Sequence, residues 1–159
     1  MTEDARFEDG GERPLRLKAE DAEDLQVVAA LVQDAIFPAT EMTWQAGQRR
    51  FALLLNRFRW EDQEGATKAR RAVERVQSVL AFDDVAGVQS QGVTRGDADT
   101  ILSILTLEFE AGDDGAGRMI MTLAGDGGIA LAVESVNVTL QDVTRPYIAP
   151  SRKTPEHPE

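Results

Sequence analysis

The sequence has no cysteine and only one histidine, His157, in 159 residues. Without cysteine the chain has no disulfide and no thiolate nucleophile, and one histidine cannot supply the usual zinc ligand sets. Positive charge is also scarce, because 17 Lys and Arg stand against 28 Asp and Glu, a net charge of −11. Nucleic-acid binders gain affinity from Lys and Arg that replace phosphate counterions, so this balance argues against general nucleic-acid binding. The sequence indicates no cofactor, no metal site and no catalytic motif.

Long apolar runs are missing as well. No run approaches the ~18 residues of a membrane-spanning helix. The acidic amino terminus lacks the apolar segment of a signal peptide. Hydrophobic residues still make up 42% of the chain and charged residues 28%, as in folded globular proteins. We therefore expect a soluble cytoplasmic protein that does not bind membranes.

The chain is expected to form one domain between two tails. Residues 1–13 are charged and contain glycine, whereas residues 146–159 hold four of the six prolines. Proline removes ladder donors and favours extended, irregular structure. These patterns predict a flexible acidic tail over 1–13, a single domain over 14–145 and a proline-rich tail over 146–159.

The first half of the domain is expected to hold one helix and several strands. Asp21 can cap an amphipathic helix that runs to about Gln33. The apolar run 51–55 favours cover on both faces at the centre of a strand over 49–59. Further extended segments are expected at 15–18, 35–37, 42–44 and 85–88, with a polar loop at 61–68. Periodicity within 69–82 fits either a helix or a strand; we favour a strand over 73–82, because it leads directly into the Asp83-Asp84 turn.

The second half is expected to be a meander. Alternating apolar residues predict strands over 101–110, 118–124 and 129–142, with the turn 125–128 requiring positive φ. Leu105, Leu107 and Phe109 are assigned to one face of the first of these strands. The apolar phase of the last strand changes near Glu134, where a bulge or bend is expected. One helix with seven or eight strands predicts an α+β fold, mainly antiparallel sheet, which can curl into a partly open barrel.

Basic residues gather in the window 49–75. The window holds eight of the 17 basic residues and four of the 28 acidic ones, so its charge is +4 against −15 for the rest. Guanidinium groups bind carboxylates or phosphates through paired hydrogen bonds and stack on aromatic rings. The predicted contact site for an acidic partner or small anion is Arg50, Asn56, Arg57, Arg59 and Trp60. The alternative is that these arginines neutralise the protein's own acids and cover the sheet.

Several segments of the chain carry a family resemblance. They are LKAEDAEDL at 17–25, RFALLLNRFRWE at 50–61, LAFDDV at 80–85 and QSQGV at 89–93. Together they resemble a family of uncharacterised bacterial proteins, catalogued as a domain of unknown function, over about 15–145. The run from Asn56 to Glu61 is the most specific piece. The resemblance implies a single-domain bacterial protein and brings no activity and no catalytic residue.

The expected function is that of a non-enzymatic interaction module whose Arg/aromatic strand region contacts an acidic partner or a small anion. An alternative is a protein that binds a small or apolar ligand between its helix and strands, lined by Trp44, Met119 and Met121. The third hypothesis is an enzyme whose carboxylate side chains act as acid and base. A homodimer is left open, because exposed antiparallel edges often pair.

Overall fold

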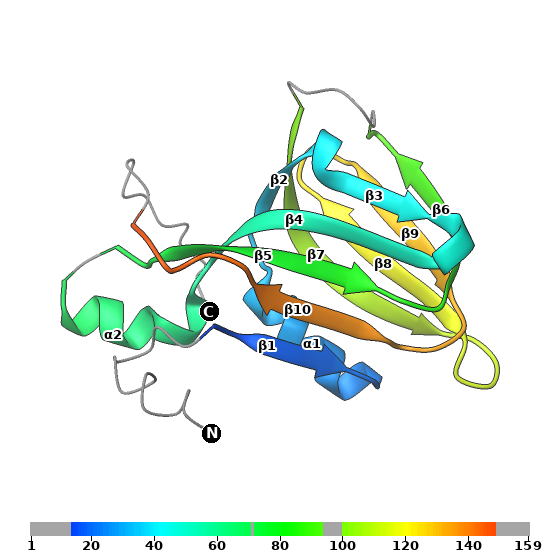
Figure 1. Cartoon of the computed structure of the whole chain (residues 1–159), viewed down its shortest axis with the longest axis horizontal. Coiled ribbons are helices and arrows are strands. Elements are labelled where there is room, and N and C mark those ends of the chain that lie inside the picture. The colour runs from blue at the N-terminus through cyan, green and yellow to red at the C-terminus, as the bar shows by residue number, and fades with distance from the viewer. Residues whose placement is uncertain (1–13, 71, 94–99, 149–159) are drawn as a thin grey trace.

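The computed structural model describes residues 14–70, 72–93 and 100–148. Their main feature is a ten-stranded antiparallel sheet, which confirms the expected α+β class. The strand order is β1-β10-β5-β4-β2-β7-β8-β9-β6, with β3 paired to β4 beside this path. The sheet curls without closing into a barrel (Figure 1). The strands are β1 Arg16–Ala19, β2 Ile36–Pro38, β3 Met42–Gln45, β4 Arg50–Phe58, β5 Arg75–Phe82, β6 Val85–Gln91, β7 Ile101–Ala111, β8 Gly117–Leu123, β9 Gly128–Val133 and β10 Val138–Asp142.

The expected amphipathic helix is α1, Ala22–Leu31. The side chain of Asp21 accepts a hydrogen bond from the backbone N–H of Asp24 at 2.7 Å, which satisfies one of the free donors of the first turn. Leu25 and Val28 are buried. The helix packs against β1 and β7, which are not neighbours in the strand order, and its buried residues belong to the main core cluster.

The hydrophobic core fills the inside of the curl. Alternate residues of β4, β5, β8 and β9 point into it, as the two-residue period of strands requires. In β4 this alternation leaves Leu54 only half-buried on the outer face, so the apolar run 51–55 does not receive full cover on both sides. Phe51, Leu53 and Leu55 are each at most 2% exposed.

Two strands of the expected meander differ from the prediction. Opposite β8, the register of β7 shifts between Ile104 and Thr106, so Ile104 and Leu107 are buried while Leu105 is 42% exposed. This bulge breaks the single face assigned to Leu105, Leu107 and Phe109. The predicted strand 129–142 is two strands, because β9 pairs with β6 and β8 while β10 pairs with β1 and β5. The predicted change of direction near Glu134 therefore separates two parts of the sheet.

Short helices replace the polar loop predicted at 61–68. The 3₁₀ turn η4, Trp60–Asp62, leads into α2, Gln63–Lys68. Ala66 is buried there beside Phe58 and Val73 in a small separate cluster. Two other 3₁₀ turns, η2 (Ala39–Glu41) and η3 (Ala46–Gln48), flank β3.

Other local predictions are confirmed. The ambiguous stretch before Asp83 is a strand from Arg75, not a helix. Gly125 and Asp126 adopt the positive φ values expected of their hairpin turn, 85° and 70°. The predicted tails lie mostly outside the described residues. None of the described helices is long and apolar enough to cross a membrane.

Candidate functional site

The predicted arginine site begins at Arg57, which is fully buried. Its place in β4 puts it on the core face, two residues beyond Leu55. Its Nη2 donates to both carboxylate oxygens of Asp142 at 3.1 Å, and its Nε donates to the hydroxyl of Ser78 at 3.2 Å. Nη1 and Nη2 donate to the two carboxylate oxygens of Glu61, each at 2.9 Å. A charge so far from water needs this set of partners.

The network keeps its members charged. Burial lowers the pKa of Arg57, but hydrogen bonding and attraction to Glu61 and Asp142 outweigh it, so that pKa is raised. Burial likewise raises the pKa of Glu61, yet the hydrogen bonds and charge of Arg57 bring it below its ordinary value of 4.5. Asp142 also accepts from the backbone N–H of Leu15 at 3.1 Å, which connects this network to the start of β1.

The other four predicted site residues also have partners within the chain. Arg59 forms an ion pair with Glu74, and Arg50 one with Asp83 at 3.3 Å. The amide oxygen of Asn56 accepts from the Tyr147 hydroxyl at 2.9 Å, and the Trp60 indole N–H donates to the Gln33 carbonyl at 2.9 Å. The five residues therefore do not converge on one open surface. Contact of Arg50 or Arg59 with an acidic partner stays a prediction, whereas Arg57 has no exposed surface to offer.

The ligand lining considered from the sequence is also dispersed. Met119 and Met121 are 1% and 2% exposed in the main core. Trp44 is half-buried on β3, packed against the edge of that core. Of these three side chains, Trp44 alone reaches the surface.

Sequence reasoning did not find the free edge of the sheet. Among the described residues β6 pairs only with β9, and β3 only with β4. The sequences of these two strands, VAGVQSQ and MTWQ, contain no charged residue and no proline. Edge strands commonly carry Lys, other charges or Pro, which discourage pairing with another chain. The uncharged run 85–93 could have drawn attention to this strand, but the lack of charge is informative only when the strand lies at the edge of the sheet.

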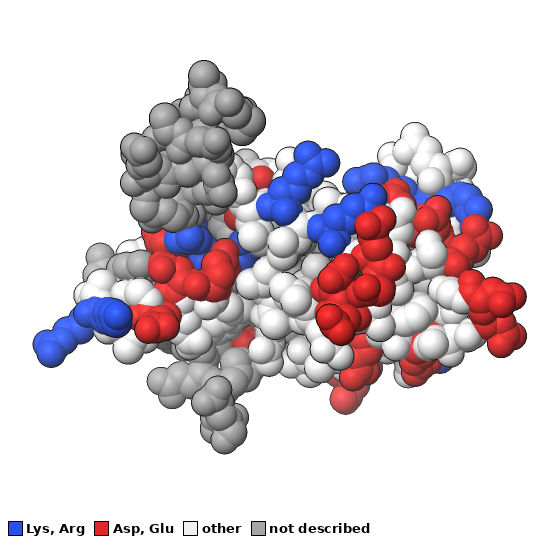
Figure 2. Space-filling view, turned by 90° about the horizontal axis from the view of Figure 1, so that it is seen from below, with Lys and Arg blue, Asp and Glu red and all other residues white. Residues whose placement is uncertain are grey.

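The opposite end of the sheet has a different character. β1 is four residues long and carries Arg16 and Lys18, both exposed. Charged side chains of both signs cover much of the face on this side of the molecule (Figure 2). The β1 edge therefore has the protection that the β6 edge lacks.

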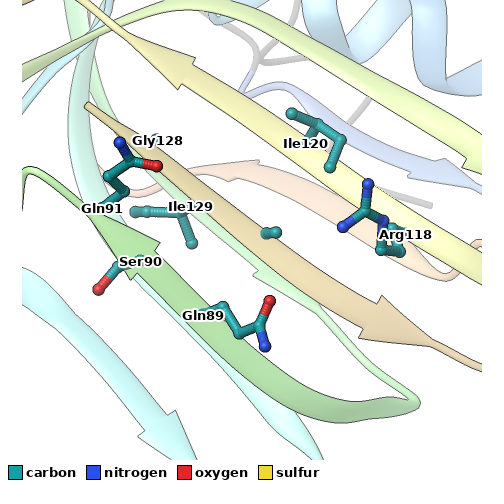
Figure 3. Close-up of a pocket in the computed structure, with 8 residues that line it drawn as sticks. Gln89, Ser90, Gln91, Arg118, Ile120, Gly128 and Ile129 are labelled. Atoms are coloured by element: carbon teal, nitrogen blue, oxygen red, sulfur yellow. The ribbon is translucent and has the colours of Figure 1, made fainter. Parts of the chain in front are cut away.

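A shallow trough lies on the outer face of β6, β9 and β8. Gly128 and Ala130 of β9 line it with little side-chain bulk, between Gln89 of β6 and Arg118 of β8 (Figure 3). Its volume is about 600 Å³. Arg118 donates to Glu110 at 2.7 Å, but both side chains are more than half exposed, so this ion pair contributes little and can exchange.

Comparison with known proteins identifies the chain only at the level of a family. A family model described as a protein of unknown function (DUF2948) matches residues 15–157. No curated protein and no solved structure matches the chain.

Proposed function

Since the chain belongs to the DUF2948 family, whose description assigns no function, we propose from its structure that it is an interaction module. It holds an extended segment of a partner polypeptide along the free edge of β6. The observation that supports this is the edge of a seven-residue strand that is uncharged and free of proline, and that pairs on one side only among the described residues. A row of unpaired backbone N–H and C=O groups selects an extended backbone as its ligand.

The side chains of β6 leave this edge accessible. Gln89, Ser90 and Gln91 are consecutive exposed residues, so neither face of the strand is covered at its end. The bulge of β6 lies at its start, between Val85 and Gly87, and the rest keeps a regular register with β9. A strand with regular register is the part of an edge that another strand can extend.

The expected partner is another, basic polypeptide. Pairing of two β6 edges would bring together two chains of net charge −11 each, which repel at long range. A segment within a basic partner is instead attracted by the same field. The acidic partner expected from the arginines stays a separate prediction, and Arg50, Arg57 and Arg59 already pair with acids of this chain.

A peptide-display selection against the purified protein tests the proposal. Ser90→Lys places a charge on the exposed edge, and Thr106→Lys makes the same charge change at an exposed position within the β7–β8 ladder, where Thr106 lies opposite Thr122. We expect selected peptides to bind the wild type and Thr106→Lys alike and to lose at least about tenfold in affinity for Ser90→Lys. Equal affinity for the two lysine variants would contradict β6 as the docking edge.

The second candidate function is the binding of a small carboxylate in the trough, supported by the exchangeable pair of Arg118 with Glu110. Arg118 can offer a bidentate contact there, with the Gln89 amide as a further donor. Calorimetric titration with a panel of small carboxylic acids checks this. If a carboxylic acid binds the Arg118→Gln variant as well as the wild type, the trough is not its binding site.

A further inference from the structure

We propose that a second hollow, on the outer face of β2 and β4, binds a compact organic amine. The apolar body of the ligand lies over Leu54, and its ammonium group pairs with Glu41. The hollow has a volume of about 260 Å³, and apolar side chains, two side-chain amides and one carboxylate line it. None of its lining residues belongs to β6, so this site goes beyond the proposed function and does not depend on it.

The hollow lies where the ladder beside β4 is interrupted. β2 pairs with β4 only at Ile36 and Asn56, and its last residue, Pro38, pairs with Ile101 of β7 instead. Proline has no backbone N–H to donate to a ladder. The chain then turns through η2, and pairing with β4 resumes only with β3. Among the described residues Leu54 therefore has no paired neighbour on this side, and it stays half-buried.

The side chains around this interruption are mainly apolar. Asn56 lies opposite Ile36, so Leu54, two residues earlier in β4, shares their outer face. Ile36 and Pro38 are half-buried, and Ile101 is 57% exposed. A bound apolar body would remove these surfaces from water, which favours binding. The volume of about 260 Å³ is smaller than that of pockets for drug-sized ligands, so the ligand is compact.

Glu41 selects the charge of the ligand. It is the only charged residue that lines the hollow, and its side chain is exposed. None of the ion pairs between described residues includes Glu41. An ammonium group donates strong hydrogen bonds to a carboxylate. The net charge of −11 also attracts cations and repels anions, so an amine fits this hollow and a carboxylic acid does not.

Two amides complete the lining without adding charge. Asn56 and Gln77 are opposite one another in the β4–β5 ladder, so their side chains are neighbours on the outer face. The amide oxygen of Asn56 accepts from the Tyr147 hydroxyl at 2.9 Å, which holds this side chain in place. The amides can hydrogen-bond a polar group of either kind, and Glu41 alone distinguishes a cation from a neutral ligand.

Methyl NMR of the purified protein tests the site, with benzylamine as the probe. Benzylamine has one aromatic ring and one ammonium group, and benzyl alcohol is its uncharged match. We expect benzylamine at millimolar concentrations to shift the methyl signals of Ile36, Leu54 and Ile101, which line the hollow. Benzyl alcohol should bind at least about fivefold more weakly, because it cannot pair with the Glu41 carboxylate as a cation.

Two pairs of variants sharpen the test. Glu41→Gln should weaken benzylamine binding about fivefold, whereas Glu108→Gln, the same change at an exposed position of β7 outside the hollow, should not weaken it. Ile101→Ala should weaken binding about threefold through lost apolar contact. Its control is Leu105→Ala, since Leu105 is 42% exposed on the same strand and does not line the hollow.

The outcomes separate the ligand from the site. Equal affinity of the wild type and Glu41→Gln, or equal binding of benzylamine and benzyl alcohol, would overturn an amine as the ligand. Methyl shifts scattered outside the hollow, or none at millimolar concentrations, would overturn the site itself. Ser90→Lys should bind benzylamine as the wild type does, so a failure of this site is distinguishable from a failure of the β6 edge.

Discussion

The two ends of the sheet, β1 and β6, differ in how well their free backbone groups are protected from pairing with another chain. β1 is short and charged, packs against α1, and is joined to β10 beside the buried Arg57 network. β6 is longer and neutral, with exposed residues on both faces at its end. An open edge invites pairing with another chain. One end of the sheet is therefore protected, whereas the other end is able to accept a strand.

The largest effect is expected where the protected end meets the core. Arg57→Ala would leave Asp142 as an uncompensated buried charge and should lower the free energy of unfolding by about 3–5 kcal/mol. Denaturant unfolding measures this, and hydrogen exchange should show faster exchange of β1 amides, because Asp142 binds the Leu15 N–H. Arg49→Ala, which removes a pair between two exposed side chains, is the control and should stay close to wild type. Similar stability of the two variants would show that the network does not hold β1.

A smaller, pH-dependent effect is expected at Glu61. Its pKa is lowered in the folded state, so its contribution is fully present above its ordinary value of 4.5 and is lost as the pH falls through the lower folded value. Glu61→Gln should therefore cost about 1–3 kcal/mol at pH 7. The cost should shrink progressively below about pH 4.5. Urea unfolding of both proteins from pH 7 to pH 3 measures the difference, and a gap that does not change with pH would rule out the charge of Glu61 as its cause.

The role of charge in protecting an edge strand is tested by removing the charges of β1, so that it becomes neutral like β6. Arg16→Thr combined with Lys18→Thr removes both charges of β1 and should produce weak, concentration-dependent self-association in sedimentation velocity. Stability should change by less than about 1 kcal/mol, since both side chains are exposed. A double variant that stays monomeric would mean that α1 or the shortness of β1, not its charge, protects this edge.

The smallest change in stability is expected at the open end. Ser90→Lys alters an exposed side chain of β6 and should shift the melting temperature little while lowering peptide affinity at least about tenfold. Thermal unfolding beside the binding measurement separates these two results. A large loss of stability would show that Ser90 is needed for the folding of the sheet. The loss of peptide binding could then not be assigned to the edge of β6, and the comparison between the two edges would be weakened.

Local structure was largely predictable from the sequence. The Asp21 cap, the periodicity of α1 and the alternation in β5 and β8 depend on neighbours in the chain, and these elements formed as expected. The bulge in β7 was not predictable, because it is defined against the register of β8. The helix α2 was missed because its main signal, the burial of Ala66, depends on packing against Phe58 and Val73.

The candidate site was less predictable than the fold. The charge segregation around Arg57 is visible in the sequence, but its carboxylate partner Asp142 is 85 residues away along the chain. No local pattern indicates that a strand-end arginine and a distant aspartate will meet on the same core face. Trp44 is likewise partly exposed because β3, among the described residues, pairs with β4 alone, and the sequence does not indicate this pairing.

The order of amino acids already carries the chemistry of each strand: the charges of β1, the neutrality of β3 and β6, and the alternation that gives each strand an inner face. Which of these strands lie at an edge, and which charges are buried together, depends on the folded sheet. Alternation and capping act over a few residues, whereas an edge exists only once every other strand has paired. The same seven neutral residues of β6 would be ordinary interior strand in the middle of the sheet, and at its end they form a surface that can bind another chain.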